Sequence, residues 1–231
     1  MNQERRTKLL QAAAGAAFLA LAIVLVLIVV NASSGDGGDT EIDGAAEVNR
    51  HLRGIPQQGL VLGDPEAPVE LVEFGDLQCP ACAGYTEEIL PPVIAGPVKR
   101  GEVKISFRNF AIIDEDSVPA GAAAVAAGAQ GRGWNFIELF YGNQGREGSG
   151  YADDEFLEAV AKAAGVKDLA KWNADRANSE DEVEKTSEEA QRLGFTGTPS
   201  FAIKGPKTEG LKPLGTPSSS GGLEEALEAA S

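Results

Sequence analysis

The stretch EFGDLQCPAC, residues 73–82, decides the fold of this chain, and it contains both cysteines of the 231 residues. It begins inside an apolar run, Val69–Gly75 (VELVEFG), which predicts a buried strand. Pro80 directly follows the first cysteine. Proline is favoured at the first helical position because its φ is already helical and its missing N–H is not needed there. The stretch therefore predicts a strand, a short loop and a helix whose N-cap residue is Cys79.

This position predicts an unusual chemistry for Cys79. A sulfur at the N-cap faces the unpaired backbone N–H groups of Ala81 and Cys82 and the positive end of the helix dipole. Both stabilise a thiolate over a thiol, so we expect a low pKa for Cys79. Cys82 lies one turn further along the same helix face, at a separation that is compatible with a disulfide. The pair could therefore close and reopen without moving the backbone.

Two other roles for the cysteines are weaker alternatives. A structural disulfide would close a loop of only four residues and remove about 2 kcal/mol of unfolded-state entropy, against about 4.7 kcal/mol for a loop of about 100 residues. A tetrahedral metal site would be one ligand short, because His51 is the only histidine and we expect it to be solvated. We predict a redox-active Cys79–Cys82 disulfide, with no metal and no other cofactor.

The N-terminal region predicts a membrane anchor. Ala12–Val30 is an uninterrupted apolar run without a charged residue, close to the roughly 20 residues that a spanning helix needs. Three basic residues, Arg5, Arg6 and Lys8, precede it, which places the N-terminus in the cytoplasm. A cleaved signal peptide is the alternative, although signal cores usually run about 7–15 apolar residues. The predicted divisions are a cytoplasmic tail at 1–8, a transmembrane helix at 9–30, a flexible linker at 31–52 and a domain at 53–231.

Composition limits the class of protein and its partners. With 43% hydrophobic and 24% charged residues, most of the chain is expected to be globular. A formal charge of −15 argues against nucleic acid as a partner, because binding to phosphates needs clustered lysine and arginine. The anchor predicts a single-pass protein of the cell membrane with its domain outside the cytoplasm. The cysteines would then lie in an oxidising compartment.

The remaining pattern predicts an α/β domain. Val103–Phe110 alternates apolar and polar residues and predicts a second strand. A helical block follows, and its last helix opens with a capping box, Ser179 with Glu182, and closes on Gly194. Two short strands and a terminal helix complete the order. The predicted helices and later strands are Val118–Gln130, Trp134–Tyr141, Asp153–Ala164, Lys167–Ala177, Ser179–Leu193, Ser200–Lys204, Leu211–Leu214 and Leu223–Ala230.

These residues resemble a known family. GDPEAPVELVEFGDLQCPAC (63–82), the later GFTGTPSF (194–201) and the helical block between them are similar to the DsbA branch of the thioredoxin superfamily, particularly its bacterial members anchored by one helix. The resemblance covers about residues 57–231. It implies a thioredoxin fold with a helical insertion at about 114–194, and a thiol-disulfide oxidoreductase that acts on thiols of exported proteins.

The resemblance also implies roles for individual residues. Cys79 would be the nucleophile and Cys82 the resolving cysteine, with Pro80 and Ala81 between them as support. Pro199 would be a cis-proline packed against the pair, and Thr198 would offer its backbone to an extended substrate by strand addition. An ordinary turn at Thr198 and Pro199 is the alternative from the residues alone.

Glu73 matches a family acid that relays protons to and from the resolving cysteine. Its spacing agrees, because it shares a strand face with Val69 and Leu71, an unusual place for a charge. A glutamate at the strand end that points to water is the alternative.

The redox direction stays open at this point. Ala81 stands where the strongest oxidants of the family have a histidine that stabilises the thiolate, and Thr198 is a residue type found in relatives that reduce or isomerise. We expect a dithiol oxidase, recycled by a quinone-linked membrane protein or a small-molecule oxidant. A reductase or isomerase of the same fold is the second hypothesis. A non-catalytic peptide-binding or chaperone module is the third.

Overall fold

The computed structural model describes residues 40–231, and every strand and helix below lies in that part of the chain. The predicted cytoplasmic tail at 1–8, the predicted spanning helix at 9–30 and most of the predicted linker at 31–52 lie outside the described residues. Within residues 40–231, no helix has both the length and the apolar character that crossing a bilayer requires.

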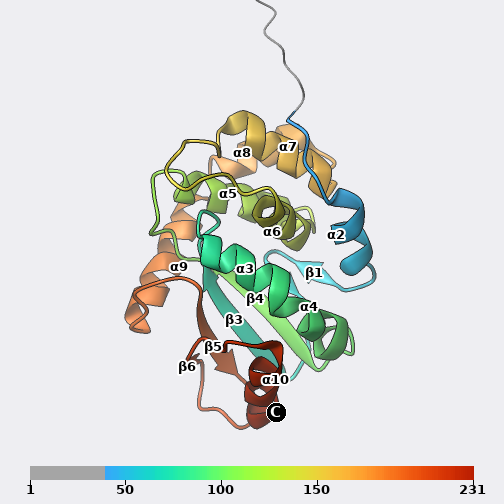
Figure 1. The fold of residues 1–231 in the computed structure, drawn as a ribbon, viewed down its shortest axis with the longest axis vertical. Coiled ribbons are helices and arrows are strands. Elements are labelled where there is room, and N and C mark those ends of the chain that lie inside the picture. Colours follow the sequence, from blue (N-terminus) through green and yellow to red (C-terminus); the bar gives the residue numbers. More distant parts are fainter. Residues whose placement is uncertain (1–39) are drawn as a thin grey trace, which may run out of the picture. The chain divides into compact units, whose positions relative to one another are not determined.

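A six-stranded sheet lies at the centre of the described domain, in the order β1-β2-β4-β3-β5-β6 (Figure 1). Strand β3 runs parallel to β4, whereas the other pairs are antiparallel. The predicted strands are confirmed to within a residue at each end, while the first two strands were not predicted. The strands are β1 Gln57–Gln58, β2 Val61–Leu62, β3 Val69–Gly75, β4 Val103–Asn109, β5 Ser200–Lys204 and β6 Lys212–Leu214.

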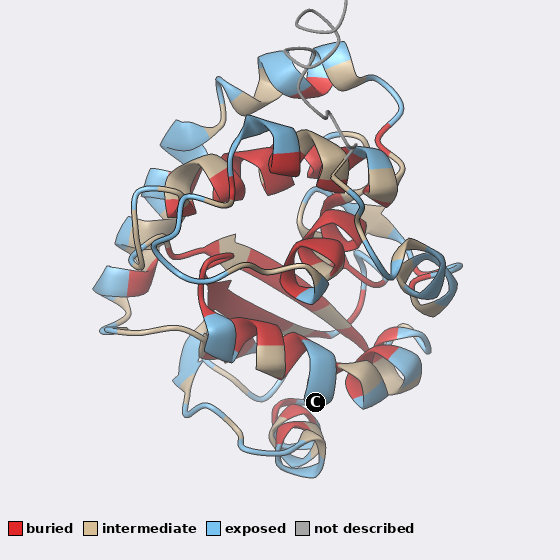
Figure 2. Cartoon of the chain, turned by 45° about the horizontal axis from the view of Figure 1, so that its top comes forward, coloured by how far each residue is buried: buried red, intermediate tan, exposed pale blue. Residues whose placement is uncertain are grey.

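Strand β3 is buried because helices cover the sheet on both faces, and the central strands are mostly red in Figure 2 for this reason. On one face Leu71 packs in the main core together with residues of α3 (Pro80–Glu88) and α4 (Leu90–Val93). On the other face Val72 and Phe74 pack against Ala190. Since side chains alternate along a strand, Glu73 shares the face of Leu71 and points into the main core.

The predicted helical insertion lies between β4 and β5. Trp134, Phe136 and Phe140 are completely buried, so this aromatic group is part of the core. The prediction of a capping box is wrong. Ser179 is the N-cap residue, but its hydroxyl makes no cap hydrogen bond and donates instead to the carbonyl oxygen of Asp175 at 2.7 Å. The insertion contains α5 Ser117–Gly128, α6 Gly133–Gly142, α7 Asp154–Ala164, α8 Leu169–Arg176 and α9 Glu180–Arg192, and α10 Ser220–Ala230 follows β6.

The prediction of a flexible linker is wrong for its last residues. Ala45–His51 forms helix α2, where Val48 packs against the core and Leu52 is buried. These two apolar side chains lie one helical turn apart. The residues between them are polar, so the helix was not predicted from the sequence. The expectation that His51 is solvated is also not met. Its side chain is only 25% exposed, and its Nε2 lies 3.8 Å from the Oε1 of Glu138.

Candidate active site

Cys79 is the N-cap residue of α3, with φ and ψ of −80° and 116°. Its carbonyl oxygen accepts hydrogen bonds from the backbone N–H groups of Cys82 and Ala83, at 3.1 and 3.2 Å. The two thiols are free in this structure. Cys79 is 5% exposed and Cys82 is fully buried, so Cys79 is the more accessible of the two.

The pKa values of the two thiols move in opposite directions. A hydrogen bond with the Cys82 thiol lowers the pKa of Cys79 to about 6, and backbone N–H groups of Cys82 and Ala81 contribute, although burial opposes them. Burial raises the pKa of Cys82 far above the usual thiol range, and its bond to Cys79 adds to the rise. At neutral pH the pair therefore holds a thiolate at Cys79 and a proton on Cys82. The thiolate is the nucleophilic form of cysteine.

The loop before β5 lies against this thiol. The Sγ of Cys79 is 3.5 Å from the carbonyl oxygen of Thr198, and the Thr198–Pro199 peptide bond is cis. The sheet explains the approach: β3 and β5 are antiparallel, with Phe74 opposite Ser200. The end of β3 that leads to Cys79 therefore lies beside the start of β5.

Glu73 lies fully buried in β3, and neither oxygen of its carboxyl group has a hydrogen-bond partner. Burial raises its pKa to about 8, and the negative charge on Cys79 contributes to the rise. Opposite Glu73 across the sheet is Phe201, whose ring packs against Tyr85 of α3 at a centroid distance of 4.5 Å. The carboxyl group is therefore largely protonated at neutral pH. It can release or take up a proton near the two thiols as their charges change.

Asp76 fixes the loop that carries Cys79, a role that sequence analysis did not identify. One carboxylate oxygen accepts the backbone N–H of Gln78 at 2.9 Å. The other accepts the backbone N–H groups of Ile112 and Ile113 at 2.8 and 3.0 Å. Burial raises the pKa of Asp76, while these backbone bonds act in the opposite direction. Asp76 therefore ties the cysteine loop to the loop that follows β4.

Helix α6 supports the same loop from the insertion. The Tyr141 hydroxyl donates to the carbonyl oxygen of Asp76 at 3.1 Å. The Gln144 amide, two residues beyond the helix end, donates to the carbonyl oxygen of Leu77 at 2.6 Å. Both contacts join residues more than 60 positions apart. No local pattern in the sequence signals them, so only the tertiary structure could reveal them.

The surface around Cys79 is accessible and apolar. Pro80 and Ala81 are exposed, and Ile112 has 42% of its surface exposed. The loop after β4, which contains Ile112, is held close to the cysteine loop by Asp76. Among residues 40–231, no three histidine, cysteine or acidic side chains come together as a metal site. His51 lies instead beside Glu138 of α6.

The chain is similar to proteins that form disulfides. The thioredoxin family profile matches residues 56–228. The probable disulfide bond formation protein D of Bacillus cereus is 32% identical over 149 residues, which cover 62% of this chain and 69% of that protein. Disulfide bond formation protein D of Bacillus subtilis is 29% identical over 147 residues, covering 62% of this chain and 66% of the relative.

Solved structures agree with the fold. The crystal structure of oxidised BdbD from Bacillus subtilis superposes with a TM-score of 0.65 at 25% identity, covering 75% of this chain and 96% of that one. A thioredoxin-like oxidoreductase from Silicibacter pomeroyi gives a TM-score of 0.59 at 28% identity, over 81% of this chain and 96% of the other. Together with the cysteine pair at the head of α3, these similarities make the chain a thiol-disulfide oxidoreductase. It belongs to the thioredoxin family, in the DsbA-like branch.

Proposed function

We propose that the chain is a dithiol oxidase that introduces disulfides into exported proteins through Cys79 and Cys82. The opposite pKa shifts of the two thiols carry this proposal. A stabilised Cys79 thiolate favours the reduced enzyme and therefore favours removal of electrons from a substrate. At pH 7, lowering a thiol pKa from 9 to about 6 stabilises the reduced pair by about 1.4 kcal/mol, which corresponds to about 30 mV for this two-electron couple.

The first step is attack by a substrate thiolate on the Sγ of Cys79 in the oxidised enzyme. A bond forms between the substrate sulfur and Cys79, while the Cys79–Cys82 bond breaks. Cys82 leaves as a thiolate in a buried position, where a negative charge is unfavourable. Glu73, protonated at neutral pH, supplies the proton that neutralises it.

In the second step another thiolate of the substrate attacks the substrate's own sulfur in the mixed disulfide. The substrate disulfide forms, and Cys79 departs as a thiolate. Its low pKa makes it a good leaving group, because low-pKa thiols leave faster. Two electrons have then moved from the substrate to the enzyme. The substrate has become a disulfide and the enzyme a dithiol.

Substrate would bind beside Cys79 in an extended conformation. Thr198 lies next to the thiol. Its backbone would pair with the substrate by strand addition, and Pro199 would pack against the cysteines. Exposed Ala81 and Ile112 border the same area. Backbone pairing accepts many sequences, which suits an enzyme that acts on different exported proteins.

Reoxidation requires an electron acceptor, and we assign it to a quinone-linked membrane oxidoreductase. In this proposal residues 9–30 anchor the chain with its N-terminus in the cytoplasm, and the domain from about residue 53 onward works outside it. The apolar run and the basic residues before it support this orientation.

A trapping experiment tests catalysis. In a Cys82→Ala variant the resolving thiol is absent, so mixed disulfides through Cys79 should accumulate with reduced exported proteins under oxidising conditions. A non-catalytic binding module would form no such adduct. Equilibration of the wild-type pair with glutathione buffers then gives its potential. Values near −120 mV favour an oxidase, and values near −270 mV favour the reductase alternative, as for DsbA and thioredoxin respectively.

A further inference from the structure

A polar pocket lies far from the cysteines, at the other end of α6. It has a volume of about 280 Å³ and is formed where the turn after α2, strand β1 and the turn between α5 and α6 meet. Arg132 is the N-cap residue of α6, whereas Tyr141, near the other end of the helix, contacts Asp76. Ten helical residues span roughly 15 Å. The pocket is therefore separate from the active site, and the proposed function does not involve it.

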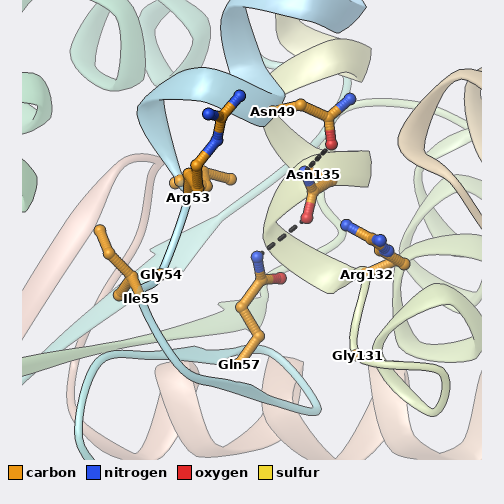
Figure 3. Close-up of a pocket in the computed structure, with 9 residues that line it drawn as sticks. Asn49, Arg53, Gly54, Ile55, Gln57, Gly131, Arg132 and Asn135 are labelled. Atoms are coloured by element: carbon orange, nitrogen blue, oxygen red, sulfur yellow. Dashed lines mark hydrogen bonds between the residues drawn. The ribbon is translucent and has the colours of Figure 1, made fainter.

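A chain of amide side chains forms the pocket wall (Figure 3). The amide nitrogen of Gln57 donates to the Oδ1 of Asn135 at 2.9 Å, and the amide nitrogen of Asn135 donates to the Oδ1 of Asn49 at 3.1 Å. The backbone N–H of Trp134 donates to the Oε1 of Gln57 at 3.1 Å. All three amide oxygens therefore already accept a hydrogen bond. Each amide nitrogen still has a second hydrogen to donate, and each oxygen, with two lone pairs, can accept one more hydrogen bond.

Two guanidinium groups flank this chain. Figure 3 shows Arg53 on one side of the amides and Arg132 on the other. Among residues 40–231 neither arginine forms an ion pair, and no acidic residue lines the pocket. Guanidinium groups have only donors and are always charged. The N-terminus of α6 carries the positive end of the helix dipole, which adds to the positive electrostatic potential of the two arginines.

This composition is unusual for the domain. Residues 1–39 contain three acidic and three basic residues, so residues 40–231 carry the whole formal charge of −15. Two other pockets of this domain are each lined by several acidic residues, whereas this pocket is lined by two arginines and no acidic residue. The two guanidinium groups are donors with positive charge, which is what an oxyanion requires.

We propose that this pocket binds a phosphate group. Arg53 and Arg132 would neutralise its charge, and the free amide hydrogens of Gln57 and Asn135 would donate to its oxygens. The pocket is open to solvent on the side of Arg53 and Asn49, both of which are exposed. The phosphate could be free inorganic phosphate or part of an anionic lipid head group, and both have the oxygens that this site recognises.

Isothermal titration calorimetry of the full chain in neutral detergent, at low ionic strength, tests the proposal with inorganic phosphate as the probe. The wild type should bind one phosphate saturably. Because a charge-assisted hydrogen bond typically contributes roughly tenfold or more to binding, Arg53→Gln and Arg132→Gln should each weaken binding by about that factor. The double variant should not bind measurably.

Arg50→Gln is the matched control. Arg50 is exposed on α2, forms no ion pair among the described residues and does not line the pocket, so its removal changes the net charge alone. Unchanged affinity in this variant supports a specific site. Cooperative thermal unfolding of every variant confirms that it is folded. The proposal is overturned if the wild type shows no saturable binding, if the double variant keeps its affinity, or if Arg50→Gln weakens binding as much as Arg132→Gln.

A second titration separates the two sources of phosphate. Glycerophosphoglycerol, the head group of phosphatidylglycerol without its acyl chains, replaces inorganic phosphate as the probe. Tighter binding of this phosphodiester assigns the site to a lipid head group, and tighter binding of inorganic phosphate assigns it to the free ion. Arg132→Gln should weaken whichever ligand binds.

Discussion

The Sγ of Cys79 lies 3.5 Å from the carbonyl oxygen of Thr198, although 119 residues separate them in the chain. The contact exists because β3 and β5 pair in the sheet and bring their adjoining loops together. Thr198 also has a buried hydroxyl without a hydrogen-bond partner. This hydroxyl can donate to the thiolate once Cys79 has lost its proton.

The first prediction concerns that hydroxyl. After the bond from Cys82, the Thr198 side chain contributes to the low pKa of Cys79. Thr198→Val keeps the shape but removes the donor, so the pKa of Cys79 should rise by up to about one unit, the equivalent of a single hydrogen bond. The ultraviolet absorbance of the thiolate, followed against pH, measures it. Thr196→Val, an exposed position two residues earlier, should leave the pKa unchanged. An equal rise in both variants would rule out this role.

Glu73 gives a prediction about stability and pH. Its pKa is about 8 in the folded protein and about 4.3 in an unfolded chain, so between these values the folded state binds more protons. The stability associated with Glu73 is thus complete below about pH 4.3 and falls as the pH rises to about 8. Glu73→Gln removes this loss. The variant should be more stable than the wild type at pH 8, by a few kcal/mol, with no advantage at the acid end. Urea unfolding of the reduced protein at a series of pH values measures it.

Glu138 supplies the control for Glu73. It lies in α6, and burial also raises its pKa to about 8. Glu138→Gln should therefore change the pH dependence of stability in the same direction. Only Glu73→Gln should slow the formation of mixed disulfides, because Glu73 is the acid that supplies a proton to the departing Cys82 thiolate and its charge is coupled to Cys79 and Cys82. Equal kinetic effects of the two substitutions would contradict a proton relay at Glu73.

Asp76 should be a positioning residue for the cysteine loop. Asp76→Asn replaces one acceptor oxygen by an NH₂ group that faces backbone N–H donors. Leaving such donors unsatisfied costs roughly 1–3 kcal/mol each, so the free energy of unfolding should fall by about that amount. The mixed-disulfide step should also slow, because Gln78 and Ile112 are no longer held together. Asp153→Asn, at the N-cap of α7, should cost little, since asparagine caps helices as well as aspartate does. Stopped-flow kinetics and denaturant unfolding together measure the two effects.

We expect Ala81 to limit the oxidising strength of the cysteine pair. Ala81→His places a cationic donor beside the Cys79 thiolate in an exposed position, which should lower the pKa of Cys79 further. The potential should become more oxidising by tens of millivolts, since about 1.4 kcal/mol corresponds to about 30 mV. Ala95→His makes the same change at an exposed site after α4 and should leave the potential unaltered. A glutathione titration that gives the same potential for wild type and Ala81→His would refute this explanation.

Local signals explain what the sequence could predict. A strand leading to Cys-Pro predicts the N-cap at Cys79, and the alternation along β3 indicates that Glu73 faces the core. Strands β1 and β2 have two residues each, too few to produce a periodic pattern. The predicted capping box at Ser179 does not form, because the serine hydroxyl donates to the carbonyl oxygen of Asp175 in α8 instead.

Long-range contacts explain what the sequence could not predict. Asp76 acquires its role from Ile112 and Ile113, which the parallel pairing of β3 and β4 brings close. The phosphate pocket depends in the same way on Arg53 and Arg132, which are almost 80 residues apart. Neither cluster has a spacing that local sequence patterns could reveal.

The most direct test of the account is the rate of alkylation of the reduced wild-type protein by iodoacetamide as a function of pH, with the modified residue identified by mass spectrometry. Thiolates react and thiols do not, so the rate reports the ionisation of the reacting cysteine. We expect modification of Cys79 alone, with a midpoint near pH 6. A midpoint at or above the roughly 8.5 of an ordinary thiol, or modification of Cys82 first, would contradict it.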